Sequence, residues 1–236
     1  MIGSSLMSPR AAFPYGHYPI AFVANNDEGT WSFVPPPDTV SLNGLIANLG
    51  CDGSGIYGHW LVDVLPRLHR VLEAGHNVDQ FLFAGTARAW QLDMLRALDI
   101  DLARCHFVDF SKSTVQCDHV VMPTFDRFNS EAQRASVAVH RRLVAKYAAD
   151  VAPTRRLFVS RKTWGGSRQI LNRDEVESVF QEAGFEIVEP QNYPFVDQIR
   201  LFASASAVAG ETGSGMHNAV FCAPGTHVCL LQSATT

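Results

Sequence analysis

Apolar and polar residues alternate along this chain with periods that predict helices and strands in succession. Over residues 56–73 apolar side chains recur at helical spacing, and short apolar runs bounded by polar residues follow. The pattern before residue 150 predicts helices over 56–73, 87–98 and 129–149, and strands over 31–34, 80–84, 105–109 and 119–122.

The alternation becomes regular after Asp150-Val-Ala-Pro153, where the proline ends the preceding helix. Strands are expected over 156–160, 185–189, 207–210 and 227–232, and helices over 173–183, 195–205 and 215–223. Strands and helices in this order predict a parallel sheet covered on both faces. We therefore expect an α/β protein with an N-terminal domain over residues 1–152 and a C-terminal domain over residues 153–236.

A glycine-rich loop, Gly210-Glu-Thr-Gly-Ser-Gly-Met-His-Asn218, joins an expected strand to an expected helix. This order presents backbone N–H groups and the positive end of a helix dipole to an anion. Two interpretations fit the loop, a phosphate site and a tight turn without a ligand. The first makes Gly213, Ser214, Gly215 and Asn218 candidate phosphate contacts.

Two arginines lie where a bound diphosphate would need positive charge. Ser160 ends the strand expected at 156–160, Arg161 lies just past it, and Arg168 follows a loop with two glycines. Parallel sheets bind ligands at the carboxyl ends of their strands, and guanidinium groups bind phosphate oxygens in pairs. The alternative is that both arginines are solvated and that Ser160 only caps the turn.

Three polar residues at intervals of four, His59, Asp63 and Arg67, predict a polar stripe on the first helix. Pro66 should kink this helix or mark a boundary in it. A carboxylate beside His59 orients the ring and makes it more basic, as a general base requires. Catalysis and a purely structural His–Asp pair both remain open, and Glu211 beside the glycine loop competes for the base role.

Several segments also occur together in an order that resembles a known family. They are Tyr57-Gly-His-Trp-Leu-Val-Asp-Val-Leu-Pro-Arg67, Leu157-Phe-Val-Ser-Arg-Lys162 with Arg168 and Asn172-Arg-Asp-Glu175, Phe195-Val-Asp-Gln-Ile-Arg-Leu-Phe202, and the glycine loop. With them the chain resembles glycosyltransferase family 61, which includes capsular polysaccharide biosynthesis proteins, over about residues 45–232. The resemblance implies a GT-B-like fold, with two Rossmann-like domains whose parallel sheets face a cleft.

The resemblance further implies transfer, with inversion, of a sugar from a nucleotide diphosphate donor to a glycan or lipid-linked glycan. The donor would bind the C-terminal domain at Ser160, Arg161, Arg168 and the glycine loop, and the acceptor would lie near His59. Family members carry a histidine before the glycine–small–glycine unit, where this chain has Thr212, so that role is not carried over. Arginines and loop N–H groups would stabilise the leaving diphosphate, so we expect no metal and no other cofactor.

Charge and composition exclude other partners. The net charge is −4 and neither half of the chain is basic, so nucleic acid is not expected as a partner. No apolar stretch approaches the ~20 residues of a membrane span. Five scattered cysteines without Cys-x-x-Cys spacing are typical of reduced thiols, which favours a cytoplasmic protein, soluble or peripheral to a membrane.

Three weaker patterns are interpreted structurally. Asp99 and Asp101 have the spacing of an Asp-x-Asp metal motif but follow an expected helix, and Asn172 with Glu175 fits a helix capping box. Ser214 lacks the Gly-x-Ser-x-Gly frame of a hydrolase nucleophile. Two other function classes stay open, a non-catalytic nucleotide-sugar or glycan-binding module of the same fold and an α/β enzyme acting on phosphorylated metabolites.

Overall fold

The computed structural model of the chain describes residues 23–25, 31–33, 36–51, 53–124, 127–128, 131–132, 134–164 and 170–232. Its contacts form two compact units. Unit 1 comprises the described residues up to Arg88 and those of Ile100–Ala135, and unit 2 comprises Ala89–Asp99 and the described residues from Ser136 onward. The domain boundary expected between residues 152 and 153 stays a prediction.

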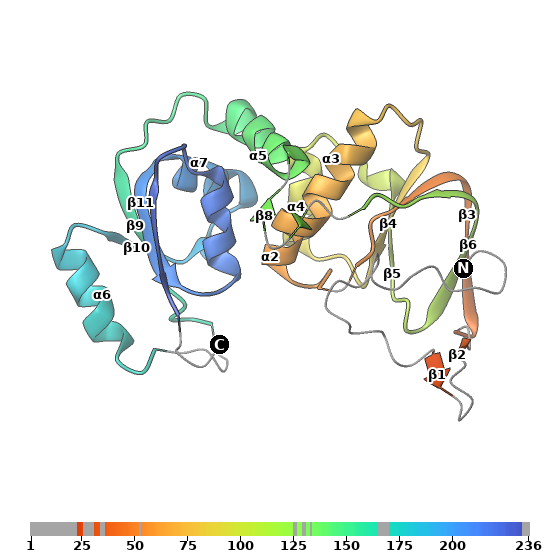
Figure 1. Cartoon of the computed structure of the whole chain (residues 1–236), viewed down its shortest axis with the longest axis horizontal. Coiled ribbons are helices and arrows are strands. Elements are labelled where there is room, and N and C mark those ends of the chain that lie inside the picture. Colours follow the sequence, from red (N-terminus) through yellow and green to blue (C-terminus); the bar gives the residue numbers. More distant parts are fainter. Residues whose placement is uncertain are drawn as a thin grey trace. The chain divides into compact units, whose positions relative to one another are not determined.

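Unit 1 is built on a parallel sheet with the strand order β5-β4-β3-β6 (Figure 1). The strands are β3 (Asp38–Asn48), β4 (Gln80–Ala84), β5 (Cys105–Val108) and β6 (Ser113–Val121). Two antiparallel pairs accompany the sheet, β1 (Val23–Asn25) with β2 (Trp31–Phe33) and β7 (Arg127–Phe128) with β8 (Glu131–Ala132). The four strands predicted in this region are confirmed, and β6 begins earlier than expected.

The sequence pattern does not predict β3, because Asn43-Gly44 in its centre is a typical turn dipeptide. Gly44 has a φ of 85°, and the pairing of β3 with β6 shifts register between Leu42 and Leu45. The Asp79 carboxylate accepts a hydrogen bond from Leu45 N at 2.7 Å and lies where a side chain at position 44 would stand. The strand thus continues through Asn43-Gly44 because the Asp79 carboxylate accepts a hydrogen bond from the backbone at the bulge.

The segment between β3 and β4 is helical, as predicted, but its helix changes type. It comprises α2 (Tyr57–His59), the π-helical η2 (Trp60–Val64) and α3 (Leu65–Glu73). The π turn ends two residues before Pro66, which has no N–H to continue an α-helical ladder. Trp60 in this segment stacks on Phe83 and Phe107, with ring centroids 5.2 and 6.1 Å apart, and so packs the helix against the sheet.

Unit 2 contains a second parallel sheet, with the order β10-β9-β11-β12. Its strands are β9 (Arg155–Val159), β10 (Glu186–Val188), β11 (Ala205–Glu211) and β12 (His227–Leu231). All four match predicted strands within a few residues. Two parallel four-stranded sheets confirm the α/β class, and the GT-B arrangement stays a prediction.

Helices α6 and α7 lie on opposite faces of the unit 2 sheet (Figure 1). Phe158 of β9 packs on Phe180 of α6 with ring centroids 4.5 Å apart, and Phe195 of α7 packs on Phe221 of η5 with ring centroids 5.8 Å apart. The α-helices of unit 2 are α4 (Ala89–Ala97), α5 (Arg134–Tyr147), α6 (Arg173–Glu182) and α7 (Phe195–Ala203). The unit also contains two 3₁₀ helices, η4 (Pro190–Asn192) and η5 (Ser214–Phe221). A third 3₁₀ helix, η3 (Leu102–Arg104), belongs to unit 1. The helix expected over 215–223 is present as η5, and it is a 3₁₀ helix.

Candidate functional site

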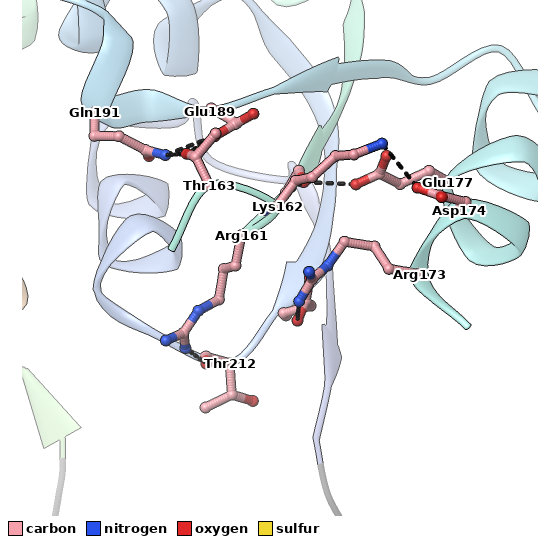
Figure 2. Close-up of polar contacts among 11 residues, drawn as sticks. Arg161, Lys162, Thr163, Arg173, Asp174, Glu177, Glu189, Gln191 and Thr212 are labelled. Atoms are coloured by element: carbon pink, nitrogen blue, oxygen red, sulfur yellow. Dashed lines mark hydrogen bonds and ion pairs between the residues drawn. The ribbon is translucent and has the colours of Figure 1, made fainter. Parts of the chain in front are cut away.

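Polar side chains gather where β9, β10 and β11 end (Figure 2). Val159 is in register with Val188 on one side and with Gly210 on the other. The residues that follow these positions therefore leave the sheet at the same edge. The expectation that Ser160, Arg161 and the glycine loop meet at one edge of the sheet is confirmed.

Arg161 lies directly against the glycine loop. Its Nη1 donates to Thr212 O at 2.5 Å, and a Cβ atom at Gly213 would stand 2.3 Å from the same nitrogen. Gly213 has an extended backbone with a φ of 165°, which any residue can adopt, and the end of the Arg161 side chain would have to shift to make room for a Cβ atom there. The Arg161 side chain makes no other hydrogen bond to a described residue, so its Nε and Nη2 donors are available to an anion.

The loop continues into η5, whose first turn contains two of the predicted phosphate contacts. Ser214 and Gly215 are half-buried, and the first N–H groups of a helix have no partner within it. Asn218 is completely buried and donates to Gln198 Oε1 at 3.0 Å and to Gly215 O at 3.1 Å. This geometry makes Asn218 a link between η5 and α7, and its donor contact stays a prediction.

Glu211, the competing candidate for the base, is buried and forms an ion pair with a partly buried arginine. Arg173 at the start of α6 donates to both of its carboxylate oxygens, at 2.7 and 2.9 Å. The two side chains are 12% and 4% exposed, and the hydrogen bonds to Glu211 raise the pKa of Arg173. Because both carboxylate oxygens of Glu211 accept hydrogen bonds from Arg173, the pair joins α6 to β11.

Ser160 caps the turn after β9, which is the alternative that the sequence left open. Its hydroxyl donates to Glu177 Oε1 at 2.5 Å and accepts from Lys162 N at 3.1 Å. Ser160 is 2% exposed and Glu177 is 8% exposed, so this link is part of the packed interior. A donor contact of Ser160 stays a prediction.

The capping box expected for α6 is wrong. Asn172 makes no side-chain cap to the helix and instead donates from Nδ2 to Glu175 Oε2 at 3.1 Å. Its φ of −102° and ψ of 43° do not have the extended geometry typical of an N-cap. Arg168, the second predicted diphosphate contact, lies outside the described residues.

The pair predicted in the first helix forms in unit 1. His59 Nδ1 lies 2.7 Å from Asp63 Oδ2, and the two side chains are 28% and 2% exposed. The ring is therefore partly accessible while its carboxylate partner is buried. When Nδ1 carries the proton toward Asp63, the lone pair of the neutral ring is on Nε2, the nitrogen that can take a proton from a substrate.

The loop before α2 closes over His59. Gly53 has a φ of 76°, and a Cβ atom there would lie 2.8 Å from two carbons of the imidazole ring. Ser54 holds the loop by donating to Cys51 O at 2.5 Å, and Trp60 Nε1 donates to Ser54 O at 2.6 Å. The loop and the helix thus fix the orientation of the ring together.

Arg67 does not continue a polar surface stripe, and this part of the prediction is wrong. It is 3% exposed and donates to Asn48 O, Leu49 O and Pro123 O at 3.0–3.1 Å. Burial lowers the pKa of its guanidinium. The π turn and Pro66 interrupt the uniform helical phase on which the stripe depended, and Arg67 instead anchors the end of β3.

A comparison with known families matches a stretch that includes both the His59–Asp63 pair and the edge of the unit 2 sheet. The sequence matches the family model described as Glycosyltransferase 61 over residues 57–229, well over half of its 236 residues. The chain belongs to the glycosyltransferase 61 family. A search of curated proteins finds no significant match. Membership confirms the resemblance and shows a glycosyltransferase-type function, with donor and acceptor substrates.

The two carboxylates of the Asp-x-Asp pattern have structural partners in this family 61 member. Asp99 lies 2.6 Å from Lys146 Nζ, and Asp101 accepts from Ala103 N at 3.0 Å. Within the described ranges no three His, Cys, Asp or Glu side chains gather as a metal site, and no helix there is long and apolar enough to cross a membrane. The expectation that the chain requires no metal stays a prediction.

Other polar residues at the sheet edge have no role in the sequence prediction. They are Lys162, Thr163, Arg173, Glu177, Glu189 and Gln191 (Figure 2). Each lies within four residues of a strand's carboxyl end or in the first turns of α6. The sequence therefore indicates that these residues lie near the sheet edge, but it does not indicate which of their side chains pair.

Proposed function

We propose that this family 61 member transfers a sugar from a nucleoside diphosphate donor to a glycan hydroxyl and binds the donor diphosphate between Arg161 and the glycine loop. The observation that carries the proposal is the contact of Arg161 with the loop at Gly213. A guanidinium with unused donors, beside the backbone N–H groups at a helix start, suits an anion with several oxygens. Family membership supports the sugar as the transferred group.

Bond breaking at the sugar moves negative charge onto the departing diphosphate. Arg161 and the N–H groups of Ser214 and Gly215 would stabilise this charge more strongly in the transition state than in the bound donor. The Arg173–Glu211 pair would act at a distance, because it holds the loop that carries these groups against α6. Glu211 is thus proposed as a positioning residue and not as the base.

His59 is the proposed base. Its Nε2 would take the proton of an acceptor hydroxyl while the hydroxyl oxygen bonds to the anomeric carbon and the bond from that carbon to the diphosphate breaks. Attack opposite the leaving group inverts the anomeric centre. Asp63, 2.7 Å from Nδ1, would stabilise the imidazolium that forms. In this proposal residues 1–152 bind the acceptor and residues 153–236 the donor, in a GT-B-like arrangement.

Substitution of the diphosphate contact tests the proposal directly. Arg161→Ala is expected to weaken nucleoside diphosphate binding by about 1.5–3 kcal/mol, the scale of hydrogen bonds to a charged group. Isothermal titration calorimetry of the parent and the variant measures this difference. Arg141→Ala removes an exposed arginine of α5 and should leave the affinity unchanged. Equal affinities of the parent and Arg161→Ala for every nucleotide that binds would refute the diphosphate site.

Chelation tests the proposed absence of a metal requirement. Donor binding and transfer are expected to persist in excess chelator, because arginine and backbone N–H groups replace the divalent cation that other sites use. Asp99→Asn combined with Asp101→Asn should likewise retain activity. Activity that chelator abolishes and magnesium or manganese restores would contradict the arginine-based mechanism.

A further inference from the structure

Glu189 lies at the same sheet edge as the proposed diphosphate site but is not one of the proposed diphosphate contacts. It follows Val188, the last residue of β10, and its carboxylate accepts hydrogen bonds from Thr163 Oγ1 and, at 2.8 Å, from Gln191 Nε2. Gln191 Nε2 also donates to Thr163 Oγ1 at 3.0 Å. The three side chains form one network at the ends of β9 and β10 (Figure 2).

Glu189 differs from the other carboxylates at this edge either in its partners or in its exposure. Glu211 pairs with Arg173, Asp174 pairs with Lys162, and Glu177 is buried against Ser160. Glu189 is only half-buried, and no cationic side chain among the described residues pairs with it. It is therefore a partly accessible carboxylate whose two described partners are neutral.

The network directly adjoins the glycine loop. Pro190, the next residue, lies 3.6 Å from the position of a Cβ atom at Gly215, so the backbone of Glu189 borders the loop. Thr163 is two residues from Arg161, and Figure 2 shows the two side chains leaving the turn toward Glu189 and toward Thr212 respectively. A ligand with its diphosphate at Arg161 would place its adjoining group near Glu189.

We propose that Glu189 accepts hydrogen bonds from the 2′ and 3′ hydroxyls of the donor's ribose, an inference that rests on the proposed function. A carboxylate has two acceptor oxygens for two neighbouring hydroxyl donors. In dinucleotide-binding sheets an acidic residue near the phosphate-binding turn serves the same purpose, and here Glu189 follows β10, the strand next to β9, which Arg161 follows. Thr163 and Gln191 orient the carboxylate, and its negative charge disfavours a phosphate at the 2′ position. The site therefore selects donors with an unmodified ribose.

The test compares ribonucleotides with their deoxy forms by isothermal titration calorimetry. UDP, GDP, ADP and CDP are titrated into the full chain, and the tightest binder is compared with its 2′-deoxy counterpart. The parent is expected to bind the ribonucleotide about 10-fold or more tightly, the scale of one hydrogen bond to a charged group. Glu189→Gln should reduce this preference to about 2-fold or less, because its amide oxygen carries no charge.

Glu182→Gln, an exposed carboxylate of α6, is the matched control and should keep the full preference. Thermal midpoints of all variants show that the fold is retained. A parent without the 2′-hydroxyl preference, or a Glu189→Gln variant that keeps it, overturns this inference while the diphosphate site stands. Failure of all four nucleotides to bind overturns the proposed function and this inference together.

Discussion

His59→Ala is expected to lower the transfer rate constant kcat by about 100-fold or more and to leave donor affinity unchanged. A general base acts on the acceptor hydroxyl and contributes mainly in the transition state, so its loss affects kcat and not donor binding. Asp63→Asn keeps the volume of the buried partner but removes its charge, and it should lower kcat in the same direction. Release of nucleoside diphosphate with an active donor and acceptor measures the rate.

The control for this experiment is His76→Ala, because His76 is an exposed histidine of the same unit. It should retain full turnover. Full turnover in both His59→Ala and Asp63→Asn would place the base elsewhere and give the pair a structural role. A parent chain that binds donors but transfers no sugar to any glycan would favour the alternative of a non-catalytic binding module.

Arg173→Ala is expected to lower the free energy of unfolding by about 3–5 kcal/mol, because it leaves the buried Glu211 carboxylate without its partner. Arg173 and Glu211 are joined by two hydrogen bonds across 38 residues of chain, so the loss also frees α6 from the end of β11. Urea unfolding monitored by circular dichroism measures the change.

A double variant separates the buried charge from the lost packing. Arg173→Met combined with Glu211→Gln should recover most of the lost stability, since no unpaired charge remains in the interior. Lys162→Ala breaks the neighbouring exposed pair with Asp174 and should not shift the unfolding midpoint measurably. A single Arg173→Ala variant as stable as the parent would show that solvent already screens Glu211.

Local patterns predict most of the secondary structure. The strands of the unit 2 sheet are short apolar runs separated by helical periods, and each is close to its expected position. The pattern fails at β3, where Asn43-Gly44 resembles a turn and only the distant Asp79 makes the extended course favourable. It predicts a helix at η5, although apolar spacing does not distinguish an α-helix from a 3₁₀ helix.

The sequence by itself determined the contacts that depend on short separations along one element. His59 and Asp63 are four residues apart on a helix, and their pairing follows from helical geometry even though a π turn intervenes. Arg161 and the glycine loop were placed together because strands of a parallel sheet end at one edge. The family motifs include both of these features.

Only the tertiary structure decided which polar groups remain available to a ligand. Glu211 pairs with Arg173, Ser160 with Glu177 and Asn218 with Gln198, and each pair joins residues 17–38 positions apart. No periodicity relates such residues, because their distance depends on how the helices pack on the sheet. The burial that makes these pairs structural, and leaves Arg161 and Glu189 accessible, likewise arises only when the whole unit has folded.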